Sequence, residues 1–265
     1  MKFTKMHGIG NDYLFVNCFE EVIENPERLA IVMSKPHFGA GADGLVLIEP
    51  ADGADFAMRI FNADGSEAKM CGNGIRCVGK YVYDKGYTRK TELKIETLSG
   101  IKTLYLRTSE GKVTDVTVDM GFAEVETGRV LTLGDEELDY TFVSVGNPHA
   151  VLFVDDAEHV PLETRGPAIE KHPDFPDGVN VEFVQVLSET RLRMRVWERG
   201  SGVTMACGTG SCAVAAAAVA KGICKEGAKI SVVLDGGILE IFVGKDGQLL
   251  MTGPACTVYE GEVIL

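Results

Sequence analysis

The sequence has no excess of positive charge, no long apolar run and no Cys-x-x-Cys pair. Its 265 residues include 26 basic and 39 acidic side chains, which give a net charge of −13. This balance argues against nucleic acid and anionic membranes as partners, because both need a basic surface. The longest apolar run, Ala213–Ala220, is far too short to cross a bilayer. The first eight residues also lack the apolar segment of a secretory signal.

Cysteine usage indicates a reducing compartment. Seven cysteines are an odd number in a chain of this length, which makes a poor disulfide framework. We therefore expect thiols rather than disulfides, and a cytoplasmic location. No metal is expected, because there is no Cys-x-x-Cys pair and the five histidines show no spacing typical of zinc ligands.

One glycine-rich segment resembles a cofactor motif but lacks the context that such a motif needs. Gly39–Gly44 matches the glycine spacing of a dinucleotide-binding loop, which must follow a strand and precede a helix. Here a predicted strand, Leu45–Ile48, follows the glycines, and Lys35–Phe38 before them is no strand. We interpret the segment as a turn. No lysine lies in a recognisable pyridoxal phosphate context, so no cofactor is predicted.

Two short passages of the chain are nearly the same. Met70–Gly74 in the first half reads Met-Cys-Gly-Asn-Gly, and Ala206–Gly210 in the second half reads Ala-Cys-Gly-Thr-Gly. Each passage predicts a tight turn that places a thiol at the start of a helix. The two helices are expected over residues 75–83 and 211–220. The second helix is apolar on every face, which predicts that it is buried and wrapped by strands.

Most of the remaining chain predicts strands, and their order repeats from one half to the other. Further helices are predicted at residues 26–33 and 161–171. The expected strands are residues 45–48, 55–61, 93–97, 101–106, 113–120, 150–154, 181–186, 191–197, 229–234 and 238–243, with 258–265 adding a last strand to either half. We infer an α+β fold with an internal duplication. The expected domains are residues 1–118 with 254–265, and residues 119–253.

The repeated thiols indicate acid–base chemistry at a carbon atom. A helix start presents unpaired N–H groups and partial positive charge, so we expect a lowered pKa for Cys71 and Cys207. One thiolate would remove a proton from an amino acid Cα, and the other thiol would return one from the opposite face. Backbone donors would stabilise the charge that develops on the carboxylate. Buried cysteines are more often structural, and we keep that interpretation for Cys18, Cys77, Cys212, Cys224 and Cys256.

These passages and several others resemble the diaminopimelate epimerase family. The resemblance runs nearly from end to end, and its motifs are Met6–Asp12, Phe61–Ser66, Met70–Cys77, Gly146–His149, Val179–Asn180, Glu198–Gly200 and Ala206–Gly210. It implies a cofactor-independent isomerase that interconverts LL- and meso-diaminopimelate for lysine and peptidoglycan synthesis. It also implies a homodimer of chains with two similar domains, each a mostly antiparallel, barrel-like sheet around a central helix, with the active site between the domains.

The resemblance further implies roles for individual residues. Cys71 and Cys207 would be the two catalytic thiols, and His149 and Glu198 would tune their pKa. The small-molecule substrate would be bound by Asn11, Asn62, Gly72, Asn73, Asn147, Asn180, Glu198, Arg199, Gly208 and Thr209. An arginine can hold the distal carboxylate through two hydrogen bonds, and asparagine side chains suit a zwitterion because each both donates and accepts.

The chain departs from the family pattern at two positions, and two alternatives to the epimerase stay open. Gly44 stands where some members have a substrate-binding glutamine, and Val203 where a glutamate is frequent, so substrate preference can differ. A proline or hydroxyproline racemase would use the same two thiols, although such enzymes usually have histidine in place of Asn73. A thiol–disulfide or binding protein would not exchange the Cα hydrogen with solvent.

Overall fold

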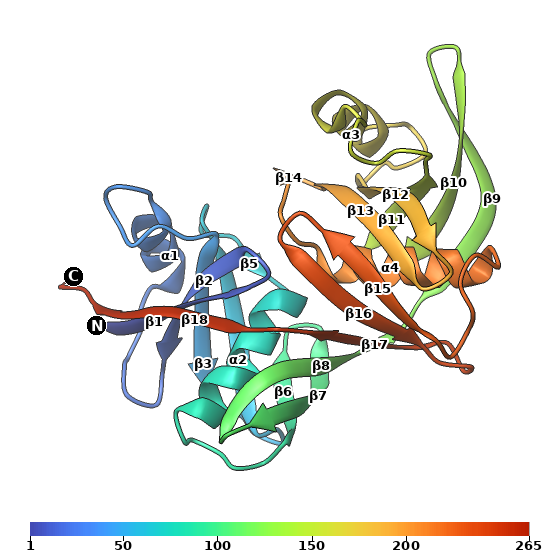
Figure 1. Ribbon diagram of the computed structural model, residues 1–265. Coiled ribbons are helices and arrows are strands. Elements are labelled where there is room, and N and C mark those ends of the chain that lie inside the picture. Colours follow the sequence, from blue (N-terminus) through green and yellow to red (C-terminus); the bar gives the residue numbers. More distant parts are fainter. Residues whose placement is uncertain (265) are drawn as a thin grey trace. The chain divides into compact units, whose positions relative to one another are not determined.

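The computed structural model describes residues 1–264 and divides into two compact units (Figure 1). The first unit comprises residues 1–118 together with the chain from Gly253 onward, and the second comprises residues 119–252. Leu265, the end of the predicted last segment, lies outside the described residues. The four helices of the described chain are α1 (Pro26–Ser34), α2 (Gly72–Asp84), α3 (Leu162–Glu170) and α4 (Gly208–Ala220).

The first unit is built from a sheet of mixed direction. Its strands are β1 (Lys2–Gly8), β2 (Asn11–Asn17), β3 (Gly44–Glu49), β4 (Phe56–Asn62), β5 (Glu67–Ala68), β6 (Glu92–Thr97), β7 (Gly100–Ser109), β8 (Lys112–Phe122) and β18 (Cys256–Glu262). Hydrogen-bonded neighbours follow the order β18, β1, β2, β3, β4, β6, β7, β8. The β2–β3 and β4–β6 pairs are parallel, and the others are antiparallel.

The second unit repeats this order. Its strands are β9 (Glu124–Leu133), β10 (Glu136–Ser144), β11 (Pro148–Phe153), β12 (Asn180–Ser188), β13 (Arg191–Glu198), β14 (Gly202–Val203), β15 (Lys229–Leu234), β16 (Gly237–Val243) and β17 (Gln248–Gly253). Neighbours follow the order β9, β10, β11, β12, β13, β15, β16, β17, with β11–β12 and β13–β15 parallel. In each unit a helix precedes the second strand of every parallel pair, so the predicted α+β class and internal duplication are confirmed.

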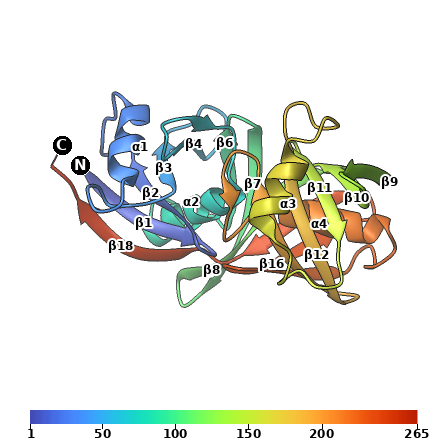
Figure 2. The same ribbon diagram turned by 90° about the horizontal axis from the view of Figure 1, so that it is seen from above.

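A central helix packs against the sheet of each unit. In the first unit α2 contacts β1, β2, β4 and β7, and in the second α4 contacts β9 to β13, β15 and β16 (Figure 2). Ten of the residues of α4, from Gly208 to Ala218, are buried, as the apolar composition predicts. Helix α2 comes close to β7 because Gly79 has no side chain: a Cβ there would lie 2.9 Å from the Leu104 side chain.

The predicted helices and strands are confirmed, and the longer strands that the prediction omits are β1, β2, β9, β10 and β17. Helix α1 begins at Pro26, and the side chain of Asn25 caps it by accepting from the Arg28 N–H at 3.0 Å. Strand β9 was not predicted because Leu131 is its only buried residue, so its sequence carries no alternation. Within residues 1–264, no helix is long and apolar enough to cross a membrane.

Candidate active site

Cys71 is the residue that caps the N-terminus of α2. Its backbone is extended (φ −136°, ψ 117°), and its Sγ accepts a hydrogen bond from the backbone N–H of Gly74 at 3.4 Å. The first N–H groups of a helix have no partner inside it and form the positive end of the helix dipole. The half-buried thiol therefore lies beside backbone donors that favour an anion.

Polar side chains of β2 and α2 meet at Cys71. Asn11 Oδ1 accepts hydrogen bonds from the Cys71 thiol at 3.4 Å and from Asn73 Nδ2 at 3.2 Å. The Tyr13 hydroxyl donates to Sγ at 3.7 Å. Burial, and then the neighbouring Cys71, raise the pKa of Tyr13 well above its usual value, so the phenol keeps its proton and remains a donor. The predicted residues Asn11, Cys71 and Asn73 are thus brought together.

A buried arginine holds Asn73 in place. Arg76 has an exposed fraction of 0%. Its guanidinium donates to Asn73 Oδ1 at 2.9 Å, to the Gly72 carbonyl at 3.1 Å and to the Pro254 carbonyl at 3.3 Å. These oxygens take the place of the water that the guanidinium loses on burial. They fix the amide of Asn73 so that its Nδ2 points to Asn11.

Asn62 joins this group through the register of the sheet. It pairs with Gly44 of β3, which in turn pairs with Tyr13 of β2. Its Nδ2 donates to Ser66 Oγ at 3.0 Å. A Cβ at Gly44 would lie 2.2 Å from the carbonyl oxygen of Phe61. The local backbone at Gly44 therefore leaves no room for a side chain.

Cys207 caps α4 in the same way as Cys71 caps α2. Its backbone is extended (φ −118°, ψ 112°), and its Sγ accepts from the Gly210 N–H at 3.3 Å. The Thr209 hydroxyl lies 3.7 Å from the same sulfur. Unlike the half-buried Cys71, Cys207 is only 6% exposed. Both predicted thiols thus occupy the helix starts that the repeated glycines indicate.

The predicted lowering of the pKa is wrong for Cys207. Burial raises the pKa of Cys207 well above its usual value, and the neighbouring carboxylates of Glu198 and Glu182 raise it further. The hydrogen bonds from Gly210 and Thr209 lower it, but they do not offset the loss of hydration. At neutral pH Cys207 is therefore a thiol, and it is suited to give a proton rather than to take one.

Glu198 lies at the end of β13 and interacts with Cys207. The hydroxyl of Thr204 donates to its carboxylate, which the thiol of Cys207 also stabilises. Burial raises the pKa of Glu198 above its usual value, although the hydrogen bond from Thr204 opposes this shift. Glu198 therefore lies where its charge acts on the proton of Cys207.

His149 lies in a hydrogen-bonded chain that leads to Cys207. Its Nδ1 is 2.6 Å from Glu182 Oε1, and its Nε2 is 3.1 Å from Asn147 Oδ1. Asn147 Nδ2 donates to Thr209 Oγ1 at 3.3 Å. His149 and Glu182 both have an exposed fraction of 0%. The predicted residues His149, Asn147 and Thr209 are therefore linked, and Glu182 extends the chain.

Asn180 and Arg199 form a separate part of the second group. Asn180 Nδ2 donates to the Pro148 carbonyl at 2.9 Å, and its Oδ1 accepts from the Arg199 backbone N–H at 3.0 Å. The guanidinium of Arg199 donates to the Asp177 carbonyl at 3.1 Å. The side chain of Asn180 thus holds the backbone of β11 and of Arg199, a role that sequence reasoning did not assign.

Sequence analysis missed several polar residues that contact the predicted ones. Arg76 and Glu182 are fully buried, and Asp43 accepts from Asn11 Nδ2 at 2.7 Å. Glu182 follows Val181 and precedes Phe183, so it resembles the solvent side of an alternating strand. Strand β12 is instead buried on both faces at this point. A charged residue in such a strand needs a buried partner of opposite charge. The signal for Glu182 is therefore a single charged residue inside an otherwise apolar strand.

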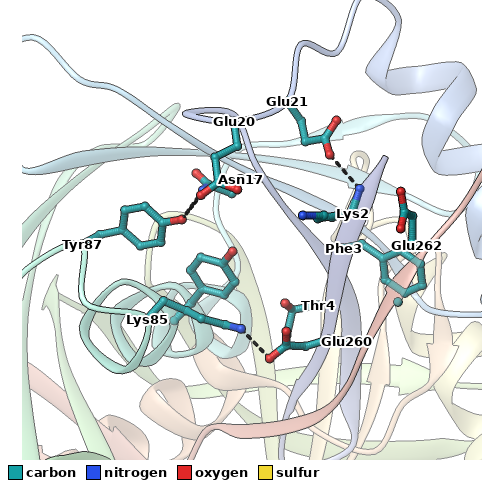
Figure 3. A pocket seen from close by; sticks show the side chains of 12 residues that line it. Lys2, Phe3, Thr4, Asn17, Glu20, Glu21, Lys85, Tyr87, Glu260 and Glu262 are labelled. Carbon is teal, nitrogen blue, oxygen red and sulfur yellow. Dashed lines mark hydrogen bonds and ion pairs between the residues drawn. The ribbon is translucent and has the colours of Figure 1, made fainter.

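A cavity of about 530 Å³ lies elsewhere in the first unit (Figure 3). Its lining comes from β1, β2 with the turn that follows it, the C-terminal end of α2 and β18, and includes no predicted site residue. Around it, the Lys85 ammonium pairs with Glu260, and the Lys2 backbone N–H donates to Glu21 at 2.8 Å. Within residues 1–264, no cluster of three or more His, Cys, Asp or Glu side chains has the arrangement of a metal site.

Sequence comparison finds a match over nearly the whole chain. The model of the diaminopimelate epimerase family matches residues 3–126 and 141–258. A diaminopimelate epimerase of Acetivibrio thermocellus is 50% identical, with 100% of this chain and 99% of the relative covered. One from Parabacteroides distasonis is 54% identical, with 99% and 98% covered. One from Methanococcus maripaludis is 52% identical, with 99% of both chains covered.

Solved structures show the same fold at low sequence identity. A phenazine biosynthesis protein of the PhzF family from Bacillus anthracis has a TM-score of 0.80 at 17% identity, covering 100% of this chain and 99% of that one. A hydroxyproline epimerase from Agrobacterium vitis, with bound trans-4-hydroxy-L-proline, has a TM-score of 0.77 at 20% identity, covering 98% and 91%. These similarities establish the fold alone.

Proposed function

Because the chain belongs to the diaminopimelate epimerase family, we propose that it interconverts LL- and meso-diaminopimelate. Cys71 and Cys207 would act as the two bases, without a metal or an organic cofactor. The reaction would serve lysine and peptidoglycan synthesis. The observation that carries the proposal is the pair of identically built caps: each unit places one cysteine at the start of a central 13-residue helix.

Inversion at a carbon requires a proton acceptor and a proton donor on opposite faces. We propose that the two cysteine groups enclose one substrate, with the thiolate of one cysteine removing the Cα proton. The electron pair moves into the α-carboxylate, and the other thiol returns a proton to Cα, leaving a thiolate behind. The reverse reaction exchanges the roles. The high pKa of Cys207 supports its role as the donor when Cys71 is the base.

The developing charge needs donors that are already in position. The first N–H groups of α2 and α4, at Gly72–Asn73 and Gly208–Thr209, would hold the α-carboxylate where its charge increases. Preorganised donors of this kind commonly make the largest single contribution to lowering the activation barrier. Their benefit rests on the helix geometry, which exists before the substrate binds.

Recognition of the far end of the substrate would depend on Arg199. A guanidinium binds a carboxylate through two parallel hydrogen bonds, and its backbone here is fixed by Asn180. Asn11, Asn62, Asn147 and Glu198 would bind the remaining amino and carboxylate groups. A site that pairs with these groups rejects amino acids that lack them.

Incubation of the purified protein in heavy water tests the proposal. We expect LL-diaminopimelate to become meso-diaminopimelate with deuterium at Cα, detected by mass spectrometry and chiral chromatography. Proline, hydroxyproline and glutamate in the same panel are the controls and should remain unchanged. Turnover of proline in place of diaminopimelate would identify a racemase, and absence of exchange in every substrate would contradict the proposal.

Two further properties follow from the family resemblance. We propose that the chain works as a homodimer and that it is cytoplasmic. Light scattering of the purified protein would give the mass of two chains. Independence of a metal is tested separately, because activity should survive exhaustive dialysis against a chelator. A monomer with full activity would show that the second chain is dispensable.

A further inference from the structure

Arg199 lies in the tight turn that joins β13 to β14. The Ser201 N–H closes this turn by donating to the Glu198 carbonyl at 3.0 Å, and Gly200 has a positive φ of 77°. In such a turn the backbone N–H groups of the two central residues, Arg199 and Gly200, have no acceptor within the turn. They therefore need partners from elsewhere in the fold.

Two side chains supply these partners. Asn180 Oδ1 accepts from the Arg199 N–H at 3.0 Å. Glu170 Oε1 accepts from the Gly200 N–H, also at 3.0 Å. The second carboxylate oxygen of Glu170, Oε2, accepts from the indole Nε1 of Trp197 at 2.7 Å. Glu170 is the last residue of α3, so this one side chain bonds to the hairpin on both sides of Arg199.

The indole of Trp197 is also held by packing, because α3 contacts both β13 and β14. A Cβ on Gly166 of α3 would lie 2.4 Å from Trp197 Cγ, and one on Gly202 of β14 would lie 3.5 Å from Trp197 Cη2. Since Gly166 has no side chain, the ring lies against the backbone of the helix. Its N–H is thereby brought to Glu170, the carboxylate at the end of the same helix.

The side chain of Arg199 leaves the turn along the loop that follows α3. Its guanidinium donates to the Asp177 carbonyl at 3.1 Å, and its Cδ lies 3.0 Å from the position of a Cβ on Gly178. The direction of the guanidinium thus depends on where the turn is fixed. A binding group must be held within about 0.5 Å of its productive geometry to be effective.

We propose, on the premise of the epimerase function, that Glu170 is a positioning residue for substrate recognition. It anchors the hairpin on both sides of Arg199, so that the guanidinium meets the far carboxylate of the substrate. Glu170 itself does not touch the substrate. The family resemblance assigns no role to this residue.

The two donors need two acceptor oxygens, and glutamine tests this requirement. Glutamine has nearly the same shape as glutamate but only one acceptor oxygen, because its other terminal group is an NH2 donor. In Glu170→Gln either the Trp197 indole N–H or the Gly200 N–H must face that NH2 group. We therefore expect the turn to lose one anchor while circular dichroism shows an unchanged fold.

Hydrogen exchange read by ¹H–¹⁵N NMR tests the anchor without any turnover. Trp197 is the only tryptophan of the chain, so its indole N–H gives a single signal. In Glu170→Gln this N–H or the Gly200 amide should exchange with solvent at least about 5-fold faster, the worth of one hydrogen bond. Glu163→Gln, at an exposed position of the same helix, is the matched control and should change neither. Unchanged exchange of both signals in Glu170→Gln would overturn the proposal.

Steady-state kinetics test the link to the substrate. A contact with the far carboxylate is made equally in the bound substrate and in the transition state, so its weakening raises KM and leaves kcat unchanged. We expect Glu170→Gln to raise KM for diaminopimelate about 5-fold to 10-fold, with kcat within about twofold. Glu163→Gln should keep both values. A fall in kcat at unchanged KM would place the effect at the reacting carbon and would overturn the proposal.

Trp197→Phe provides a rescue. Phenylalanine has no N–H, so the single acceptor oxygen of a glutamine at position 170 is then sufficient for the Gly200 N–H. In the Trp197→Phe background, Glu170→Gln should therefore raise KM by less than about twofold. A full additional loss in this background would mean that the number of acceptor oxygens is irrelevant, which contradicts the proposal.

Arg199→Met tests whether the effect passes through the guanidinium. Once the guanidinium is removed, Glu170→Gln should change KM by less than about twofold further. Independent losses would show that Glu170 acts by another route and would overturn the proposal. If the wild type epimerises no amino acid, the proposed function fails, whereas the exchange measurement still decides whether Glu170 anchors the turn.

Discussion

The two thiol-capped helices share a scaffold but differ in the charge placed around them. Both cysteines are extended caps, and both sulfurs accept an N–H from the residue three positions on. Near Cys71 the cation Arg76 is fully buried, whereas near Cys207 the ionisable groups are the fully buried Glu182 and His149 and the partly buried Glu198. The two units therefore share the backbone of the cap but differ in the charges that surround it.

This difference explains why equal positions need not have equal chemistry. A carboxylate near Cys207 disfavours its thiolate, and burial disfavours it more. At Cys71 the thiol donates to Asn11 Oδ1, and the Tyr13 hydroxyl and the Gly74 N–H donate to the sulfur. The comparison predicts different consequences for equivalent substitutions in the two units.

The largest expected effect is the loss of either thiol. Cys71→Ala and Cys207→Ala should each lower epimerisation by about 10²-fold to 10⁴-fold, the usual contribution of a positioned acid or base. Circular dichroism should show an unchanged fold, and Cys224→Ala is the control that should keep full activity. Near-normal turnover in either catalytic variant would break the two-base account.

The next effect concerns the buried cation of the first unit. Arg76→Met removes a charged hydrogen-bond donor from the oxygens of Gly72, Asn73 and Pro254. We expect the free energy of unfolding to fall by about 3 kcal/mol, measured by urea denaturation.

Arg59→Met is the control for the Arg76 substitution. Arg59 pairs with Glu67 at 2.7 Å, and its side chain is 37% exposed. Exposed pairs contribute little, so this variant should lose less than about 1 kcal/mol. A similar loss in both variants would mean that burial of Arg76 does not determine its contribution.

A matched pair of glycines tests how the caps differ in packing. A Cβ at Gly210 would lie 2.7 Å from Glu182 Oε1 and 3.1 Å from Cys207 Sγ, whereas one at Gly74 would lie 3.6 Å from the nearest atom, Cys71 Cβ. Gly210→Ala should therefore destabilise the protein by about 1–3 kcal/mol. Gly74→Ala should be neutral, or stabilising by up to about 1 kcal/mol. Thermal denaturation measures both, and equal destabilisation would contradict the packing argument.

The smallest effect concerns thiols outside the caps. Burial raises the pKa of Cys77, in the body of α2, to about 12, whereas Cys256 is exposed. Iodoacetamide at mildly alkaline pH should therefore alkylate Cys256 and leave Cys77 unmodified until the protein unfolds, as read by peptide mass spectrometry.

The raised pKa of Cys77 also predicts how the free energy of unfolding changes with pH. Because the unfolded chain loses the Cys77 proton first, the free energy of unfolding should fall as pH rises from about 9 toward about 12. The Cys77→Ala variant should show a shallower fall. In the iodoacetamide experiment, alkylation of Cys77 before the protein unfolds would show that α2 opens in the native state and would contradict the prediction.

Local patterns in the sequence were sufficient for most of the architecture. The Cys-Gly-x-Gly passages located both central helices, because glycine and a small polar cap specify a helix start within a few residues. Alternating strands such as β8 were located by their period. Strand β18 pairs with β1 in the first unit as β9 pairs with β10 in the second. The β1–β18 pairing joins residues from opposite ends of the chain, so local patterns could not predict it.

The sequence by itself determined the duplication, the two thiols at helix starts and the family, because these depend on short motifs and their order. Only the tertiary structure decided the charge around each thiol. The fold brings Arg76 to the Pro254 carbonyl near the other end of the chain. Glu182 meets His149 because β11 and β12 lie side by side in parallel. Whether a side chain is buried, and which charge lies against it, depends on residues distant in sequence. The high pKa of Cys207 arises from that burial rather than from its own motif.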